Sequence, residues 1–149
     1  MEFFIASDHA AFEGKEQLKS ALSDFTFVDL GVNSPDRANY PQYAAKLAGR
    51  VSSSNGQGIL LCGSGIGVSM VANRFKGIRA ALVSTAEEAK LSKQHNNANV
   101  LCMGARLRSV AEMEEMVRAW VSSSFEGGRH SDRIDMFNQL GENPESAKS

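Results

Sequence analysis

A cysteine and a glycine-rich segment stand next to each other near the middle of the chain. Cys62 ends a short apolar run, and residues 63–67 read Gly-Ser-Gly-Ile-Gly. Glycines that turn from a strand into a helix expose backbone amides, which can hold an anion or stabilise an oxyanion that forms during proton transfer. A thiol beside a helix N-terminus is also placed to become a reactive thiolate. The simpler alternatives are a small buried hydrophobic cysteine and glycines that serve only the turn.

The spacing of these glycines is close to that of a nucleotide-binding loop but departs from it. Val68 occupies the position of the third glycine in G-x-G-x-x-G, and no Walker lysine follows. A dinucleotide site is therefore disfavoured, and an anion- or enediolate-binding turn is preferred. A non-catalytic phosphate- or nucleotide-binding domain stays open as an alternative from another functional class.

Polar residues that can bind a ligand follow other apolar runs of the chain. Asp8 and His9 come directly after the first run, and Arg106 comes shortly after the last. In an open parallel sheet ligands bind beyond the carboxyl ends of the strands, so these groups are expected at one edge with the glycine turn. His95 and Asn96 end a predicted helix instead, and they reach the same site only if the fold brings them there.

A basic cluster lies near the C-terminal end of the chain. Arg129 and Arg133 are four residues apart, on one face of a predicted helix, and His130 lies between them. Guanidinium groups suit a phosphate monoester dianion, whereas the alternative is a solvated face on which Asp132 offsets one charge. The cysteines and histidines lack the paired spacings of a zinc site, so a metal is not expected.

These groups need a scaffold of alternating strands and helices. Short β-branched or aromatic runs alternate with helical periodicity, which predicts βαβ units around a parallel sheet whose strands are buried on both faces. The predicted strands are 3–6, 25–30, 58–62, 80–83 and 100–103. The predicted helices are 12–22, 41–51, 66–73, 85–94, 110–121 and 129–140, with capping boxes at 84–87 and 109–112. Cys102, inside the last strand, is expected in the core.

The composition is that of a single globular domain. The chain has 149 residues, of which 42% are hydrophobic and 22% charged, and no apolar run approaches the ~20 residues of a membrane span. A formal net charge of −1 gives no basic excess for nucleic acid, and two cysteines without a signal peptide indicate reduced thiols in the cytoplasm. We expect one domain over residues 1–141 and a disordered tail over 142–149.

Several motifs, in order over nearly the whole chain, are similar to those of the ribose-5-phosphate isomerase B family. They are Ser7-Asp8-His9-Ala10, Tyr40-Pro41, residues 62–67, His95-Asn96-Asn97-Ala98-Asn99-Val100 and Gly127-Gly128-Arg129-His130. The resemblance implies a metal-free and cofactor-free α/β protein, a Rossmann-like three-layer α/β/α sandwich with a five-stranded parallel sheet. It also implies a homodimer, or a dimer of dimers, whose active sites take residues from both subunits.

The activity that the resemblance implies is the interconversion of ribose 5-phosphate and ribulose 5-phosphate through ring opening and a cis-enediolate. The wider family also contains galactose-6-phosphate and allose-6-phosphate isomerases, so a six-carbon sugar phosphate stays open as the substrate. Cys62 is then the proton-transfer base, because the glutamate used by another branch of the family would stand at Val68. His95 is the residue implied to open the furanose ring, with Ser64 near the anomeric oxygen.

The remaining roles also follow from the resemblance. Asp8 is implied to hold sugar hydroxyls, and Tyr40 and Asn96 to line the sugar site. The enediolate oxygen would be stabilised by the turn formed by Gly63, Gly65, Ile66 and Gly67. The implied phosphate contacts, some of them across the dimer, are His9, Arg106, Arg129, His130 and Arg133.

Overall fold

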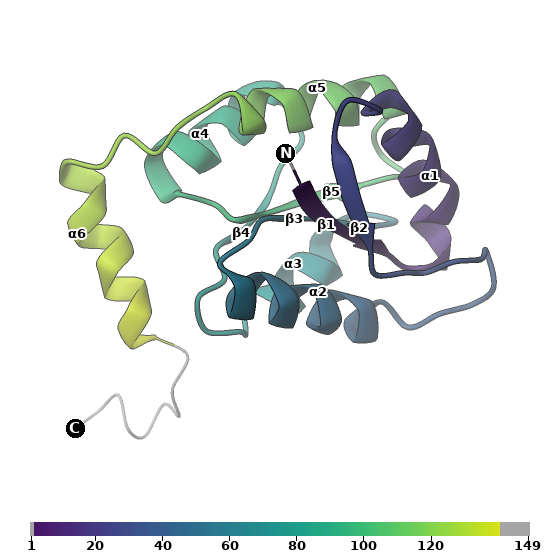
Figure 1. Cartoon of the computed structure of the whole chain (residues 1–149), viewed down its shortest axis with the longest axis horizontal. Helices are drawn as coiled ribbons and strands as arrows, with labels where there is room; N and C mark the ends of the chain where they lie inside the picture. The colour runs from purple at the N-terminus through teal and green to yellow at the C-terminus, as the bar shows by residue number, and fades with distance from the viewer. Residues whose placement is uncertain (1, 141–149) are drawn as a thin grey trace.

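A five-stranded, all-parallel sheet forms the centre of the protein (Figure 1). The computed structural model describes residues 2–140, so the expected tail over 142–149 lies outside the described residues. The strands are β1 (Glu2–Ser7), β2 (Thr26–Asp29), β3 (Gly58–Cys62), β4 (Ala80–Leu82) and β5 (Val100–Gly104). Their order across the sheet is β2-β1-β3-β5-β4.

Helices cover both faces of this sheet. They are α1 (Phe12–Ala21), α2 (Tyr40–Ser54), α3 (Ile66–Ala72), α4 (Ala86–Asn96), α5 (Val110–Val121) and α6 (Arg129–Asp135), with 3-10 turns η1 (His9–Ala11) and η2 (Met136–Gln139). Helices α1, α4 and α5 pack on one face, and α2 and α3 pack on the other. The predicted three-layer α/β/α sandwich is therefore confirmed. Within residues 2–140, none of the helices is long and apolar enough to cross a membrane.

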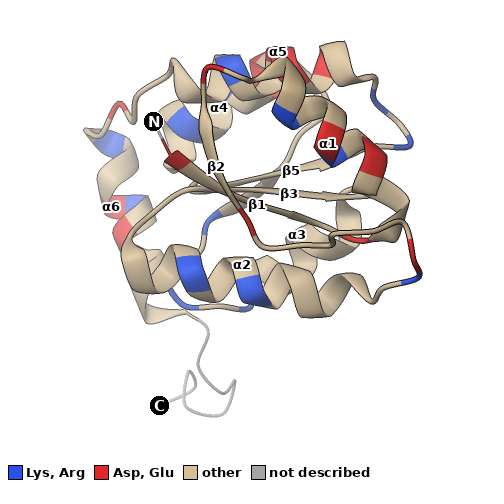
Figure 2. Ribbon diagram, turned by 45° about the vertical axis from the view of Figure 1, so that its right-hand side comes forward, with Lys and Arg blue, Asp and Glu red and all other residues tan. Residues whose placement is uncertain are grey.

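The central strands are apolar on both faces because both faces are covered. Ile5 and Leu61 pack with Trp120 of α5 in one core, and Leu60 and Cys62 pack in the other. Every residue of β3 and β5 is buried. Figure 2 shows most of the charged residues on the helices and connecting segments, with none on β3 or β5. This double burial explains the near-continuous apolar runs of the sequence.

The N-cap of helix α4 lies one residue later than predicted. The N-cap is Thr85, whose Oγ1 accepts a hydrogen bond from the Glu88 amide over 3.1 Å, whereas the sequence pattern had suggested Ser84 with Glu87. Thr85 has extended backbone angles (φ −138°, ψ 158°), so the helix begins only at the next residue. The predicted capping box at the start of α5, residues 109–112, is confirmed.

The C-terminal helix is also shorter than predicted. The expected helix over 129–140 divides into α6, which ends at Asp135, and the 3-10 turn η2. Arg129, His130 and Arg133 all lie on α6, which follows two glycines with positive φ, Gly127 at 65° and Gly128 at 55°. These glycines adopt angles that L-residues rarely take, which explains where the helix starts.

The path of the chain across the sheet reverses at β1. From β1 the chain passes to β2 on one side, and from β2 it crosses to β3 on the other side of β1. The carboxyl ends of β1 and β3 therefore border a crevice that neither connection fills. Open α/β sheets bind their ligands at such a switch point.

Candidate active site

A cavity of about 610 Å³ opens at the carboxyl ends of β1 and β3. Many of the residues predicted from the sequence line it: Asp8, His9, Tyr40, Cys62, Gly63, Ser64, Ile66, Gly67 and Arg106. Its apolar wall includes Met70 and Leu107, which the sequence analysis did not single out. The cavity thus combines a thiol, a carboxylate, an imidazole and a guanidinium at the predicted edge of the sheet.

Cys62 lies at the last position of β3 and borders the cavity with 5% of its surface exposed. Its Sγ accepts a hydrogen bond from the Gly65 amide over 3.1 Å. The turn therefore directs a backbone dipole of positive sign at the sulfur, an arrangement that suits an anionic sulfur atom. Cys62 is both a core residue of β3 and a cavity residue, so the two interpretations of its sequence position are compatible.

The glycines of the turn are required by close contacts. Gly65 has φ of 79°, and a Cβ there would come within 2.8 Å of the Met103 backbone. A Cβ on Gly67 would come within 2.6 Å of the Tyr40 ring. The glycines therefore bring the turn against the end of β5 and let Tyr40 pack on the start of α3.

Two amides of this turn have partners within the chain. The Gly65 amide binds Cys62 Sγ, and the Ile66 amide donates to Ser64 Oγ over 3.2 Å. An oxyanion at the turn would compete with the Ser64 hydroxyl for the Ile66 amide. Rotation of that hydroxyl frees the donor, because a serine side chain has three accessible rotamers on an exposed turn.

His9 is held by the backbone of the segment between β2 and α2. Its Nδ1 lies 3.0 Å from the Ala38 amide nitrogen and 3.1 Å from the Ala38 carbonyl oxygen. A neutral ring that accepts from the amide at Nδ1 carries its proton on Nε2, whereas a ring that donates from Nδ1 to the carbonyl keeps Nε2 protonated only when it is charged. Where Nδ1 accepts from the Ala38 amide, Nε2 is therefore a donor available to an anion.

Asp8 and Arg106 complete the polar part of the cavity. Asp8 caps η1 by accepting from the Ala11 amide through Oδ1 over 3.1 Å, which leaves its second carboxylate oxygen for a ligand. The Arg106 amide donates to the Gly63 carbonyl over 3.0 Å, and its side chain packs against Gly63. Arg106 is thereby tied to the turn that follows Cys62.

The other predicted site residues lie elsewhere in the same subunit. His95 and Asn96 end α4, which starts beyond the carboxyl end of β4 and returns to the amino edge of the sheet before β5. Arg129, His130 and Arg133 lie on α6, at the opposite end of the molecule from the segment between β2 and α2 (Figure 1). Within residues 2–140 of a single chain, none of these residues lines the cavity.

These distant residues form a cluster of their own. The rings of His95 and His130 stack with centroids 4.5 Å apart and an interplanar angle of 16°. Glu126 Oε1 lies 3.3 Å from Nε2 of His95 and 3.9 Å from Nε2 of His130. Burial, followed by the nearby His95 and Arg129, lowers the pKa of His130. His130 is therefore mainly neutral at neutral pH.

The same cluster could be considered as a metal site. Among residues 2–140, the potential ligand atoms of His95, Glu126 and His130 lie within 4.8 Å of one another. The stacking of the two rings does not suit coordination, because the in-plane lone pairs of nearly parallel rings do not converge on one ion. No sequence signal pointed to Glu126, which directly precedes Gly127.

Cys102 differs from Cys62 in its surroundings. It is completely buried in β5, and burial, together with the proximity of Cys62, raises the pKa of its thiol far above the ordinary value. A thiol that stays protonated cannot act as a base. The prediction that Cys102 is a core residue is confirmed.

The fold and the cavity define a parallel α/β protein with a thiol and a glycine-rich turn at the switch point of its sheet. The sequence model of the Ribose/Galactose Isomerase family matches residues 3–137, and the chain belongs to this family. It is 39% identical to ribose-5-phosphate isomerase B of Escherichia coli over 136 residues, which cover 89% of this chain and 91% of the relative.

Solved structures agree with this assignment. A ribose 5-phosphate isomerase from Thermotoga maritima superposes with a TM-score of 0.90 at 42% identity, covering 93% of this chain and 98% of that one. Ribose-5-phosphate isomerase B from Mycoplasma genitalium, solved with bound ribulose 5-phosphate, superposes with a TM-score of 0.87 at 40% identity, covering 93% and 94%.

Proposed function

We propose that this protein interconverts ribose 5-phosphate and ribulose 5-phosphate, with Cys62 as the group that moves the proton between C2 and C1. The observation that carries the proposal is the position of the Cys62 thiol, which faces a cavity also lined by His9 and Arg106 and which accepts a hydrogen bond from the Gly65 amide. The names of the similar isomerases, one of them solved with ribulose 5-phosphate, support the same substrate.

The reaction begins with the open-chain aldose, whose C1 carbonyl makes the C2 proton acidic. The Cys62 thiolate takes that proton, and the carbonyl electrons move to O1, giving the cis-enediolate. The O2 proton passes to O1, and the thiol returns its proton to C1 as the C2 carbonyl forms. General base catalysis of this kind supplies about 10²–10⁴ in rate, and donors at the oxyanion add a comparable factor.

Charged and polar groups of the cavity then hold the rest of the substrate. We assign the phosphate to His9, whose Nε2 is a donor when Nδ1 accepts from the Ala38 amide, and to the Arg106 guanidinium. We assign sugar hydroxyls to Asp8 and the ring face to Tyr40. Binding energy from a phosphate remote from the reacting carbons orients the open chain over the thiol.

Ring opening requires a second copy of the chain. His95 and Asn96 lie at the amino edge of the sheet, so a homodimer is needed to bring them, with Arg129 and Arg133 of α6, to the cavity of the other subunit. Large apolar side chains stand exposed beside the cavity: Ile66 at 46%, Met70 at 65% and Leu107 at 62%. An exposed apolar group at the rim of a cavity fits a surface covered by a partner.

The exposure of His95 and Glu126 also fits this assembly. The His95 and Glu126 side chains are 39% and 49% exposed, which leaves them accessible to a ligand bound by the partner.

Both cysteines are free thiols in the structure, which fits a reducing compartment such as the cytoplasm.

The proposal is tested by assaying the purified protein, with a chelator and without added cofactor, on ribose 5-phosphate, allose 6-phosphate and galactose 6-phosphate. We expect the highest kcat/KM with ribose 5-phosphate. A higher value with a six-carbon sugar phosphate would change the substrate but keep the reaction. Absence of turnover on all three would favour a non-catalytic phosphate-binding domain.

A further inference from the structure

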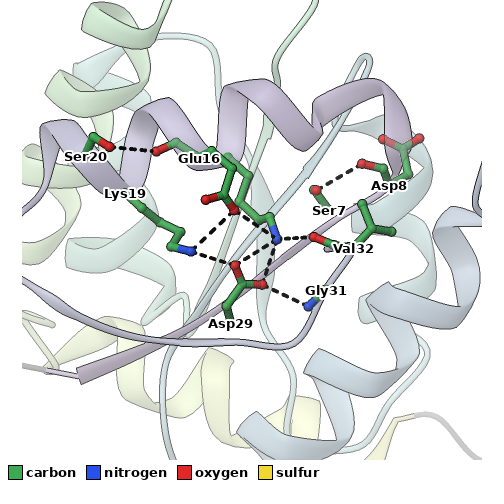
Figure 3. Close-up of polar contacts among 9 residues, drawn as sticks. Ser7, Asp8, Glu16, Lys19, Ser20, Asp29, Gly31 and Val32 are labelled. Atoms are coloured by element: carbon green, nitrogen blue, oxygen red, sulfur yellow. Dashed lines mark hydrogen bonds and ion pairs between the residues drawn. The ribbon is translucent and has the colours of Figure 1, made fainter. Parts of the chain in front are cut away.

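Lys15 is a buried cation that the proposed reaction does not use. Its side chain is 0% exposed, and its Nζ donates to both carboxylate oxygens of Asp29, over 2.7 Å and 2.9 Å, and to the Val32 carbonyl over 2.5 Å. Figure 3 shows Asp29 and Val32, which accept these bonds, beneath helix α1. Burying a lysine charge is costly unless it is fully paired, so a structural role alone would be served as well by an apolar side chain.

Asp29 links this cation to the backbone and to a second lysine. Its Oδ1 accepts from the Gly31 amide over 2.9 Å, and its Oδ2 accepts from Lys19 over 2.8 Å (Figure 3). Burial by itself would raise the pKa of Asp29, but the hydrogen bonds from Lys15 and Lys19 outweigh burial and hold the pKa below its ordinary value. The carboxylate is therefore charged throughout the neutral range.

The Lys15–Asp29 pair fixes the start of the segment over residues 30–38. At this end the Ser7 carbonyl accepts a hydrogen bond from the Val32 amide over 3.1 Å, and the Ser7 amide donates one to the Gly31 carbonyl over 2.8 Å. Gly31 packs so closely on α2 that a Cβ would come within 2.6 Å of the Tyr43 ring. The segment is thus anchored to β1, α1 and α2 before it reaches His9.

The far end of the same segment holds the ligand-binding ring. Ala38 brackets Nδ1 of His9 with its amide and its carbonyl, and Tyr40, two residues later, packs on Gly67 at the cavity wall. A shift of this segment would move the Ala38 backbone away from His9 and release the ring from its fixed orientation.

We propose that Lys15 and Asp29 are positioning residues for the sugar-phosphate site, which set the orientation of His9 through the segment over residues 30–38. The proposal rests on the proposed function, because it assigns the phosphate to His9. Lys15 touches neither the cavity nor the substrate, and it acts through the Val32 carbonyl and the Ala38 backbone. The expected consequence is a loss of substrate affinity with little loss of the chemical step.

The test compares Lys15→Met with Lys19→Met, since Lys19 also binds Asp29 but has no hydrogen bond to Val32. We expect Lys15→Met to raise KM for ribose 5-phosphate about tenfold, with kcat within about twofold, the effect of losing one charged contact that orients a binding group. Lys19→Met should leave both constants within about twofold. An unchanged KM in Lys15→Met, or the same change in both variants, would overturn the proposal.

A second readout follows the His9 ring itself. In wild-type protein, imidazole nitrogen NMR should show His9 in the single tautomer with the proton on Nε2, and Lys15→Met should show exchange between tautomers. Lys15→Arg, which keeps the charge, should restore part of the wild-type signal. If Lys15→Met does not fold, Asp29→Asn takes its place. Wild-type His9 signals and KM in whichever variant folds would contradict the proposal.

These signals do not depend on turnover. If the protein proves not to isomerise ribose 5-phosphate, the His9 spectra still decide whether Lys15 orients the ring, so failure of the proposed reaction and failure of the positioning role are distinguished.

Discussion

The amide of Gly65 donates a hydrogen bond to Sγ of Cys62 over 3.1 Å, across the turn that joins β3 to α3. The contact needs the left-handed backbone of Gly65, whose φ is 79°. It places the positive end of a peptide dipole at the sulfur atom that faces the cavity, and so connects the glycine spacing of the sequence directly to the chemistry proposed for the thiol.

Replacement of Gly65 by alanine should therefore lower both stability and activity. A Cβ at this position would collide with the Met103 backbone and would force a strained φ, so Gly65→Ala should reduce the free energy of unfolding by about 1–3 kcal/mol. Because the turn would shift, kcat should also fall by about 10²-fold or more. Urea unfolding and steady-state kinetics measure the two effects.

Gly49 provides the matched control for this substitution. It lies on the exposed face of α2, and a Cβ there would meet nothing within 4 Å. Gly49→Ala should stabilise the protein by about 0.5–1 kcal/mol and leave kcat unchanged. Equal losses in the two alanine variants would refute the assigned role of the Gly65 conformation.

The proposed sharing of active sites between two subunits predicts complementation between two inactive variants. In a homodimer with sites at the interface, Cys62→Ala removes the base from the cavity of its own subunit. His95→Asn removes the imidazole from the cavity of the other subunit. A mixed dimer then contains one site with both lesions and one intact site, so refolding an equimolar mixture should restore about a quarter of the wild-type activity. Each variant alone should be nearly inactive. If mixing restores nothing while mixed dimers form, the site does not take His95 from the partner.

Arg106 should contribute to binding of the phosphate. Arg106→Gln removes the guanidinium that borders the cavity, and we expect KM for ribose 5-phosphate to rise about tenfold or more, with a smaller change in kcat. Arg108 is the control, because it pairs with Glu112 on the surface and does not line this cavity. If Arg108→Gln raises KM as much as Arg106→Gln does, the effect is one of net charge and not of a contact.

Lys93 should add to the stability of the protein as the pH rises above 8. Burial, and then the nearby Arg79, lower the pKa of Lys93 from 10.5 to about 8, although its Nζ lies 4.3 Å from the centre of the Trp120 ring and binds Gln57 Oε1. Between these two values the unfolded chain binds more protons at this residue than the folded protein does, so unfolding becomes less favourable as pH increases.

Urea unfolding at pH 8 and pH 10 measures this effect in wild type, in Lys93→Met and in Lys90→Met, an exposed control on the same helix. The wild type should gain more free energy of unfolding between the two pH values than Lys93→Met gains, and Lys90→Met should behave as the wild type. The same gain in all three proteins would show that Lys93 does not titrate in this range.

Local sequence signals predicted most of the fold. The run at 58–62 and the periodicity at 110–121 coincide with β3 and α5, since a doubly buried strand and an amphipathic helix with a capping box leave unambiguous patterns. The start of α4 was ambiguous because Ser84 and Thr85 both suit an N-cap and Glu87 and Glu88 are both acidic. Only the backbone angles at Thr85 decide the register.

The site could be predicted only in part, for a reason of topology. Residues that directly follow β1, β3 and β5 meet at one edge because parallel strands share a direction, and Asp8, Cys62 and Arg106 were found in this way. His95 ends a helix that runs back to the other edge, so the order of the elements in one chain does not bring it to the cavity. Met70 and Glu126 belong to no recognisable motif. Met70 lines the cavity because of how α3 packs, and Glu126 lies beside the stacked pair of histidines.

Proton transfer by Cys62 is tested most directly with ribose 5-phosphate that carries deuterium at C2. The wild-type protein should lose this deuterium to solvent or move it to C1 of ribulose 5-phosphate. Cys62→Ala, shown by circular dichroism to be folded and by titration to bind the sugar phosphate, should do so about 10²–10⁴-fold more slowly. Loss of the C2 deuterium at the wild-type rate by the folded variant would contradict the assignment of Cys62 as the base.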